Sequence, residues 1–304
     1  MTAPARHAAE PRALRDRCAF AAQRRDDARA GTAPTTSGFF LVEQPGGWGR
    51  LALEESTLDT DVGIAVARAC GAVGVRPLLI RRPGRHGGGG PRRWFRVDGR
   101  AETPTIRTGT FTDDRELLEI ASDAGSGTAH DAPLVLVCTH GRHDPCCAIR
   151  GRPVAAAFGA LDPDATWECS HVGGDRFAGN VVVLPWGLYY GWVEPSDAEA
   201  LLTTVRERRV LPRLLRGRSC FPPPVQAAQA FARDALRCDG VDDLGLLAVA
   251  GAPPQWTVTL AHGDGPVRIE VRREGAPEAA TLTCAARTPV HPPAWRLLAL
   301  ERDS

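Results

Sequence analysis

Short apolar runs alternate with a helical repeat in the first half of the chain. Runs of strand length cover residues 39–43, 77–82 and 92–97, and apolar residues at helical spacing cover residues 62–70. Apolar runs bounded by Gly and Pro are typical of buried strands. Residues 38–130 are therefore predicted to form a smaller αβ domain. Its Gly-rich run over 83–91 leads into a strand pattern and not into a helix, so we interpret it as a hairpin linker and not as a phosphate-binding loop.

From residue 131 the same patterns follow one another in a clearer order. They predict, in turn, a strand over 133–138, a helix over 149–161, strands over 166–171, 181–184 and 188–193, and a helix over 197–210. A helix that crosses between two strands makes those strands parallel. The order β-α-β-β-β-α therefore predicts an α/β layer with a mixed sheet of the thioredoxin kind in residues 131–220.

The two ends of the chain have weaker patterns. Residues 1–37 are rich in Ala, Arg and small polar residues, and we expect a disordered or weakly helical leader. The Phe-Pro-Pro-Pro run at 221–224 marks a boundary. Beyond it, a helical pattern over 225–237 and alternating runs over 256–260, 267–272 and 280–284 predict an accessory αβ tail in residues 221–304.

Composition and charge exclude several classes of protein. Hydrophobic residues make up 43% and charged residues 24%, which is typical of a globular protein with a real core. A formal net charge of +1 gives no basic excess for nucleic acid. No run approaches the roughly 20 apolar residues of a membrane span, and no apolar region precedes a signal cleavage site. We therefore expect a cytoplasmic protein with reduced thiols that neither binds nucleic acid nor inserts into membranes.

Cysteine and histidine are concentrated in two segments that each follow a predicted strand. The first is CTHGRHDPCC at 138–147, and the second is WECSHVGGDRFAGN at 167–180. Loops at the carboxyl ends of neighbouring strands meet in space, and Gly173 and Gly174 permit a tight turn that brings His171 and Asp175 together. Thiolates and imidazoles bind zinc, copper or iron, so these segments predict a metal or redox centre.

The spacing of the cysteines narrows the kind of centre. Cys-x-x-Cys, which is typical of zinc ribbons and redox dithiols, does not occur in the chain. Adjacent residues cannot easily aim both sulfurs at one metal. Of Cys146 and Cys147, we therefore expect one to be a ligand and the other to pack.

The same segments resemble the sucrase/ferredoxin-like family. The resemblance also includes VVVLPWGLYYG at 181–191, FFLVEQPGGWGRLAL at 39–53 and LLIRRPGR at 78–85, so it covers roughly residues 38–220. It implies a thioredoxin-like fold with a 2Fe-2S cluster, held by two Cys of the first motif and two His of an H-x-G-G-H second motif. Transferred to this chain, it implies Cys138 and Cys147 as thiolate ligands and His171 as the first imidazole.

The chain departs from the family pattern at the fourth ligand, where Asp175 replaces the second His. A carboxylate binds iron but is a harder, anionic donor. The expected fourth ligand is therefore Asp175 or a nearby substitute, namely Cys169, His140, His143 or Cys146.

The expected function is electron transfer through a 2Fe-2S cluster between a redox donor protein and a redox acceptor protein that the sequence does not identify. This makes the chain an electron carrier more than an enzyme, and no catalytic residue is predicted. Two alternatives stay open. One is a thiol-based thioredoxin-like oxidoreductase in which Cys138 or Cys147 reacts as a thiolate. The other is a structural zinc-binding protein whose metal joins the two loops.

Overall fold

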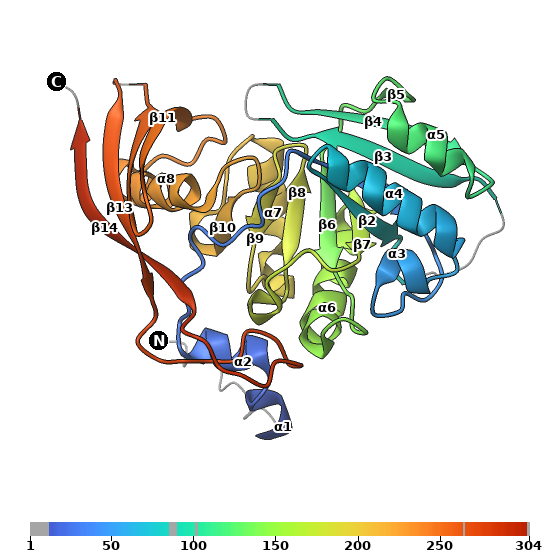
Figure 1. Cartoon of the computed structure of the whole chain (residues 1–304), viewed down its shortest axis with the longest axis horizontal. Helices are drawn as coiled ribbons and strands as arrows, with labels where there is room; N and C mark the ends of the chain where they lie inside the picture. Colours follow the sequence, from blue (N-terminus) through green and yellow to red (C-terminus); the bar gives the residue numbers. More distant parts are fainter. Residues whose placement is uncertain (1–11, 85–89, 101–102, 264, 303–304) are drawn as a thin grey trace, which may run out of the picture.

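Two sheets organise the molecule (Figure 1). The computed structural model describes residues 12–84, 90–100, 103–263 and 265–302. The larger sheet has ten strands in the order β10-β9-β8-β6-β7-β2-β1-β3-β4-β5, and the smaller has four in the order β11-β12-β13-β14. Within the described residues, no helix has the length and apolar character needed to cross a membrane.

Residues 134–206 fold in the order predicted from the sequence. The elements are β6 (Leu134–Cys138), α6 (Pro145–Leu161), β7 (Thr166–Cys169), β8 (Val181–Leu184), β9 (Leu188–Tyr190) and α7 (Ala198–Arg206). Strand β6 pairs in parallel with β7 and antiparallel with β8, and β9 pairs antiparallel with β8. The predicted α/β fold with a mixed sheet of the thioredoxin kind is therefore confirmed.

Residues 38–122 repeat this topology, which the sequence did not predict. The elements are β1 (Gly38–Glu43), α4 (Thr60–Ala72), β2 (Val75–Arg81), β3 (Arg92–Asp98), β4 (Thr105–Phe111) and α5 (Glu116–Ser122). Strand β1 pairs in parallel with β2 and antiparallel with β3, and β4 pairs antiparallel with β3. Because β1 lies between β2 and β3 in the sheet, these two strands are not neighbours, and the hairpin predicted over 83–91 is wrong. Residues 85–89 of that run lie outside the described residues.

The two units join edge to edge and then face each other. Strands β2 and β7 pair antiparallel over a short stretch, with Ile80 opposite Cys169. The rings of Phe39 in β1 and Tyr189 in β9 lie 6.4 Å apart, although four strands separate β1 from β9 in the sheet. At about 4.8 Å per strand, a flat sheet would separate them by about 24 Å. The sheet therefore curls on itself, and its inner face forms one core that both units share.

Alternation along the strands decides which face each side chain occupies. In β6, Leu134, Leu136 and Cys138 point to the shared inner core, while Val135 and Val137 pack on the outer face against α6 and α7. In the first unit, Phe40 and Val42 of β1 pack on the outer face, in one core with residues of α4. The last residue of β6 therefore places its thiol at the end of the inner core.

The remaining elements are the two edge strands of the large sheet, the strands of the small sheet and the other helices. They are α1 (Arg12–Arg15), α2 (Cys18–Arg24), α3 (Ala52–Glu55), β5 (Thr128–Ala129), β10 (Leu215–Arg218), α8 (Pro223–Leu236), β11 (Gly245–Ala252), β12 (Gln255–Ala261), β13 (Val267–Gly275) and β14 (Pro293–Arg302), with 3-10 turns at Asp175–Phe177, Pro195–Asp197 and Pro212–Leu214. Helix α8 packs on the four-stranded sheet, which makes the tail an αβ unit.

Three expectations about individual elements differ from the structure. The strand expected over 280–284 is wrong: only Ala280 makes a bridge, to Val290, and β14 completes the small sheet instead. Helix α6 begins at Pro145 and not near residue 149, because Asp144 caps it and proline is favoured at the first helical position. Strand β7 ends at Cys169, so His171 lies in the following loop.

The described part of the expected leader contains the short helices α1 and α2, and the large sheet continues across residue 130. Residues 1–11 lie outside the described residues, but α2 is packed against the rest of the molecule, with Cys18, Ala19 and Ala22 buried. The buried face of α2 consists of only a few residues, most of them small, so it gives no recognisable apolar pattern in the sequence. Residues 38–130 and 131–220 contribute to one continuous sheet, so the boundary predicted near residue 130 is not a break in the structure.

Candidate metal centre

The first motif places two thiols at the end of the inner core. Cys138 is the last residue of β6 and is buried. Cys147 lies in the first turn of α6, which Asp144 caps by accepting a hydrogen bond of 2.8 Å from the backbone N–H of Cys146. Adjacent helix residues point about 100° apart, so Cys147 faces Cys138 while Cys146 faces away from it. The expectation that only one of this pair joins the centre agrees with this placement.

The second motif turns sharply between its imidazole and its carboxylate. Gly173 and Gly174 have φ values of 93° and 82°, a conformation that favours glycine. A 3-10 turn then begins at Asp175. This geometry returns the chain on itself, so that Oδ1 of Asp175 lies 3.1 Å from Nδ1 of His171.

The two motifs meet at one point. The ligand atoms of Cys138, Cys147 and His171 all lie within 4.8 Å of one another. The Cys147 thiol donates to Oδ1 of Asp175 over 3.3 Å. Nδ1 of His171 is buried without a well-aligned hydrogen bond, although Asp175 is beside it. Two sulfurs, a ring nitrogen and a carboxylate oxygen therefore converge from two separate segments.

Of the nearby substitutes, His143 lies closest to this set. Its ring stacks on that of His171 with centroids 3.7 Å apart, and its Nε2 lies 3.9 Å from Oδ2 of Asp175. His143, His171 and Asp175 form a second set of possible ligands within 4.8 Å. His143 is therefore a possible donor beside the four residues of the main set.

His140, Cys146 and Cys169 occupy other positions. Nδ1 of His140 accepts from the backbone N–H of His171 at 3.2 Å, and Nε2 lies 2.6 Å from the carbonyl oxygen of Gly49. With both ring nitrogens engaged, His140 positions the His171 loop. Cys169 is fully buried beneath the site and belongs to the hydrophobic core. Cys146 faces a different group of thiols.

The charged forms of Cys138, His171 and Asp175 stabilise one another. Hydrogen bonding with Cys147 outweighs burial and holds the pKa of Cys138 well below its ordinary value, whereas the same contact and burial raise the pKa of Cys147. Burial opposes charge on His171, but Asp175 and Cys138 outweigh it and raise its pKa to about 9. Burial also opposes the Asp175 carboxylate, yet His171 holds its pKa below the ordinary value. The positive charge that these contacts favour on His171 thus offsets the negative charges that they favour on Cys138 and Asp175 in this buried site.

A sequence comparison now identifies the family. The model of sucrase/ferredoxin-like proteins matches residues 31–217. The chain belongs to the sucrase/ferredoxin-like family. This family member also aligns over 90 residues, at 32% identity, with "Altered inheritance of mitochondria protein 32" of Meyerozyma guilliermondii, covering 26% of this chain and 32% of that protein. The match therefore spans about a third of the length of that curated relative.

Among solved structures, this family member overlaps with a thioredoxin-like [2Fe-2S] ferredoxin from Aquifex aeolicus. One structure is 25% identical over 31% of this chain and 97% of that chain, with a TM-score of 0.27. The wild-type structure is 26% identical over 28% of this chain and 97% of that chain, with a TM-score of 0.25. The assignment of the fold here rests on the strand pairing of the chain itself.

Three polar residues that the sequence did not single out hold the second motif of this family member. Arg216 of β10 is buried and donates to the carbonyl oxygens of Gly173 and Thr32 and to the side chain of Asn180. Asn180 in turn donates to the carbonyl oxygen of Gly174. Arg76 of β2 donates to the carbonyl oxygen of His171 at 2.9 Å. Only Asn180 had a sequence signal, since it ends the second motif.

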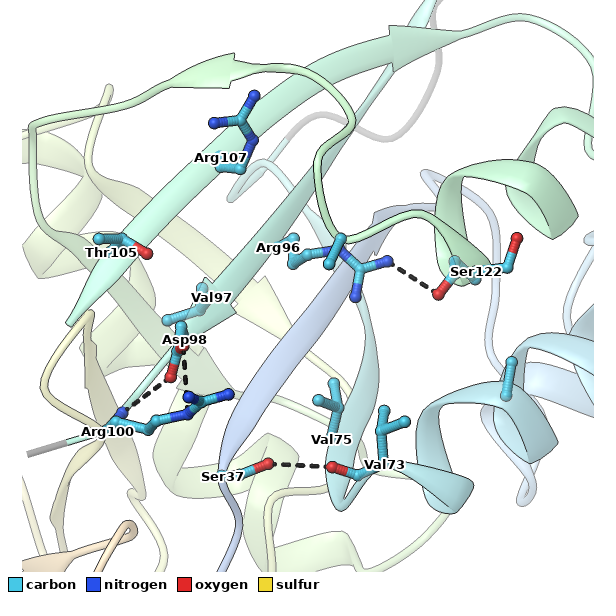
Figure 2. A pocket seen from close by; sticks show the side chains of 13 residues that line it. Ser37, Val73, Val75, Arg96, Val97, Asp98, Arg100, Thr105, Arg107 and Ser122 are labelled. Carbon is cyan, nitrogen blue, oxygen red and sulfur yellow. Dashed lines mark hydrogen bonds and ion pairs between the residues drawn. The ribbon is translucent and has the colours of Figure 1, made fainter. Parts of the chain in front are cut away.

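A pocket of about 520 Å³ in the first unit of this family member offers a different chemistry (Figure 2). Among the described residues, no cysteine or histidine lines it. Its arginines include Arg96, which donates to the carbonyl oxygens of Ile120 and Ala121, and Arg107, which donates to those of Gly125 and Ser126. These two guanidinium groups are therefore already hydrogen-bonded to the backbone of α5 and of the segment that follows it. The candidate ligands all lie elsewhere.

Proposed function

We propose that the chain is an electron-transfer protein whose 2Fe-2S cluster is held by Cys138, Cys147, His171 and Asp175. The observation that carries the proposal is the convergence of Cys138, Cys147 and His171 within 4.8 Å, with a buried Nδ1 of His171 that lacks a well-aligned hydrogen bond. Mixed sulfur and nitrogen donors suit iron-sulfur chemistry. Membership of the sucrase/ferredoxin-like family supports the same assignment.

The donor set fits such a cluster in charge as well as in type. Two ferric ions, two sulfides and two thiolates carry no net charge together. One neutral imidazole and one carboxylate then leave a charge of minus one on the oxidised cluster. When bound, the cluster supplies reversible transfer of one electron, and the added negative charge favours the oxidised form.

One histidine from each motif forms the most exposed part of this centre. The thiols of Cys138 and Cys147 are buried, whereas the side chains of His171 and His143 are 21% and 31% exposed. The imidazole edge is therefore the route by which the centre comes nearest to solvent. We place the docking of a redox donor and a redox acceptor protein at this edge.

Specific observations also favour the two alternative functions. The lowered pKa of Cys138, which follows from its contact with Cys147 and from the nearby His171, suits a reactive thiolate. The ligand atoms of Cys138, Cys147 and His171 lie within 4.8 Å of one another, which suits a single zinc ion. Both alternatives predict a colourless protein without acid-labile sulfide.

Metal analysis after anaerobic purification separates these functions. The proposal predicts two irons and two acid-labile sulfides per chain, a visible absorption spectrum and an electron paramagnetic resonance signal on reduction. Cys147→Ser is expected to lose all of them. Cys169→Ser is the matched control, because Cys169 is equally buried beside the site, and it is expected to retain the cluster. A colourless wild-type protein with reactive thiols, or with zinc that Cys147→Ser removes, would overturn the proposal.

A further inference from the structure

A second group of thiols lies on the other side of helix α6. Cys18 of α2, Cys146 of α6 and Cys284, in the segment between β13 and β14, meet there with Asp144. Figure 1 shows that segment, in red, beside α2. Cys18 and Cys284 both lie outside the residues that match the family model. This group is therefore separate from the site implied by the family.

The distances within this group suit one tetrahedral ion. The Cys146 and Cys284 sulfurs are 3.4 Å apart, those of Cys284 and Cys18 3.5 Å, and those of Cys18 and Cys146 3.7 Å. Zinc binds thiolates at about 2.3 Å, so a tetrahedral site separates its sulfurs by about 3.8 Å. A disulfide requires about 2.05 Å, and all three cysteines are free thiols. Three sulfurs at nearly equal spacing thus surround one point.

Asp144 completes the group as an oxygen donor. All four ligand atoms lie within 4.8 Å of one another. The backbone N–H of Cys284 donates to Oδ2 of Asp144 at 2.6 Å, and the backbone N–H of Cys146 donates to Oδ1 at 2.8 Å. These bonds fix the carboxylate at the end of α6 beside the sulfurs. A ligand held in this way is already oriented for a metal.

Backbone N–H groups also lie beside two of the sulfurs. The backbone N–H of Ala19 donates to the sulfur of Cys146, and that of Cys18 donates to the sulfur of Cys284. Hydrogen bonds of this kind lower the negative charge on metal-bound sulfur. Without a cation, three thiols and a carboxylate in contact give only weak hydrogen bonds.

We propose that Cys18, Cys146, Cys284 and Asp144 bind one zinc ion. The ion would join the N-terminal segment, the start of α6 and the C-terminal segment, which are far apart in sequence. Since a structural metal adds its binding free energy to folding, it would hold both ends of the chain against the unit that carries the candidate cluster. The inference does not depend on the proposed function, because the two donor sets share no residue.

Metal analysis of variants of the full chain tests this site. The wild-type protein is expected to contain one zinc per chain in addition to any iron. Cys284→Ser is expected to lose the zinc and to keep the iron content and visible spectrum of the wild type. Cys147→Ser is expected to show the reverse. Cys238→Ser is the matched control, since Cys238 is a half-buried thiol outside both groups, and it should keep both metals.

A second measurement covers the case in which Cys284→Ser does not fold. Cobalt(II) added to metal-depleted wild-type protein is expected to give the intense visible bands of a tetrahedral thiolate site, and stoichiometric zinc should displace it. Wild-type protein without zinc and without these cobalt bands would overturn the inference. A disulfide between any two of the three cysteines, found by mass spectrometry of anaerobically purified protein, would also overturn it.

Discussion

Asp175 is the single residue that most strongly sets the properties of the proposed cluster. Asp175→His would replace an anionic ligand by a neutral one, so the oxidised cluster would lose its net negative charge. We expect the reduction potential to rise by on the order of 100 mV, the direction in which His ligands act in Rieske centres. Redox titration followed by visible absorbance measures the shift.

The control for this substitution is Asp164→His, which makes the same replacement of aspartate by histidine at an exposed position. Its potential should equal that of the wild type. If Asp175→His left the potential unchanged as well, Asp175 would not be a ligand, and His143, which lies 3.9 Å from its carboxylate, would be the next residue to test.

Gly174 is the residue on which the turn between His171 and Asp175 depends. Its φ of 82° disfavours any other residue, and an added Cβ would lie 2.5 Å from Nη2 of Arg216. Gly174→Ala is therefore expected to lower the free energy of unfolding by more than the roughly 1–2 kcal/mol of the backbone conformation alone. It should also reduce the iron content.

Gly84→Ala is the matched control, because Gly84 has a similar φ of 77° and the described part of the chain has no atom within 4 Å of the added Cβ. This variant should lose free energy of unfolding only through its backbone conformation, because its added Cβ has no contact like that with Arg216. Urea unfolding and iron analysis of the two variants separate the effects. Equal losses of stability in both variants would show that the contact with Arg216 is unimportant.

At the scale of elements, strand β10 supports the metal centre through Arg216. Arg216→Met would leave the carbonyl oxygens of Gly173 and Thr32 and the side chain of Asn180 without their buried donor. Each such loss costs about 1–3 kcal/mol, so we expect a total of about 3 kcal/mol or more and a lower affinity for iron. Arg206→Met, which removes a 63% exposed arginine and one surface ion pair, should cost less than about 1 kcal/mol.

Local sequence patterns predicted most of the individual elements but not how they join. The strands of the second unit and the helix between β6 and β7 follow from apolar runs of characteristic length. The apolar pattern starts α6 near residue 149, four residues late, because the Asp-Pro pair at residues 144–145 is typical of loops as well as of helix caps. The strand expected over 280–284 was wrong, since the segment that contains Cys284 instead lies against α2 and α6.

The site itself was predictable only in part. Spacing and family resemblance pointed to Cys138, Cys147, His171 and Asp175, and the structure brings these four together. The contributions of Arg216 and Arg76 come from strands that are distant in sequence from the motif, so no local pattern could reveal them. The same reason hid the group of Cys18, Cys146 and Cys284, whose members come from three segments.

At the scale of the whole molecule, two units of one topology have different roles. The segment after β6 in the second unit supplies Cys147, whereas the equivalent segment after β1 contains no cysteine or histidine. Instead, Gly49 contacts Nε2 of His140, and the ring of Trp48 packs edge-on against the same imidazole. The first unit thus packs against the candidate metal centre of the second unit and orients His140 beside it.

The shared inner core predicts that the two units unfold together. Phe39 of the first unit packs on Tyr189 of the second, and Phe95 of the first packs on Trp167 of the second. Phe39→Ala removes a side chain from this shared core and should cost about 3–5 kcal/mol. Phe111→Ala removes one from the separate outer core of the first unit, at a similar cost.

If the units are coupled, each variant shows one unfolding transition in urea, in which far-ultraviolet circular dichroism and the visible absorbance of the cluster change together. Independent units would respond differently. Phe111→Ala would then unfold the first unit at low urea while the absorbance of the cluster persisted to the wild-type midpoint. The first unit also supplies Arg76 to the His171 loop and Gly49 to His140, so such a persistent spectrum would further contradict its role in orienting the site.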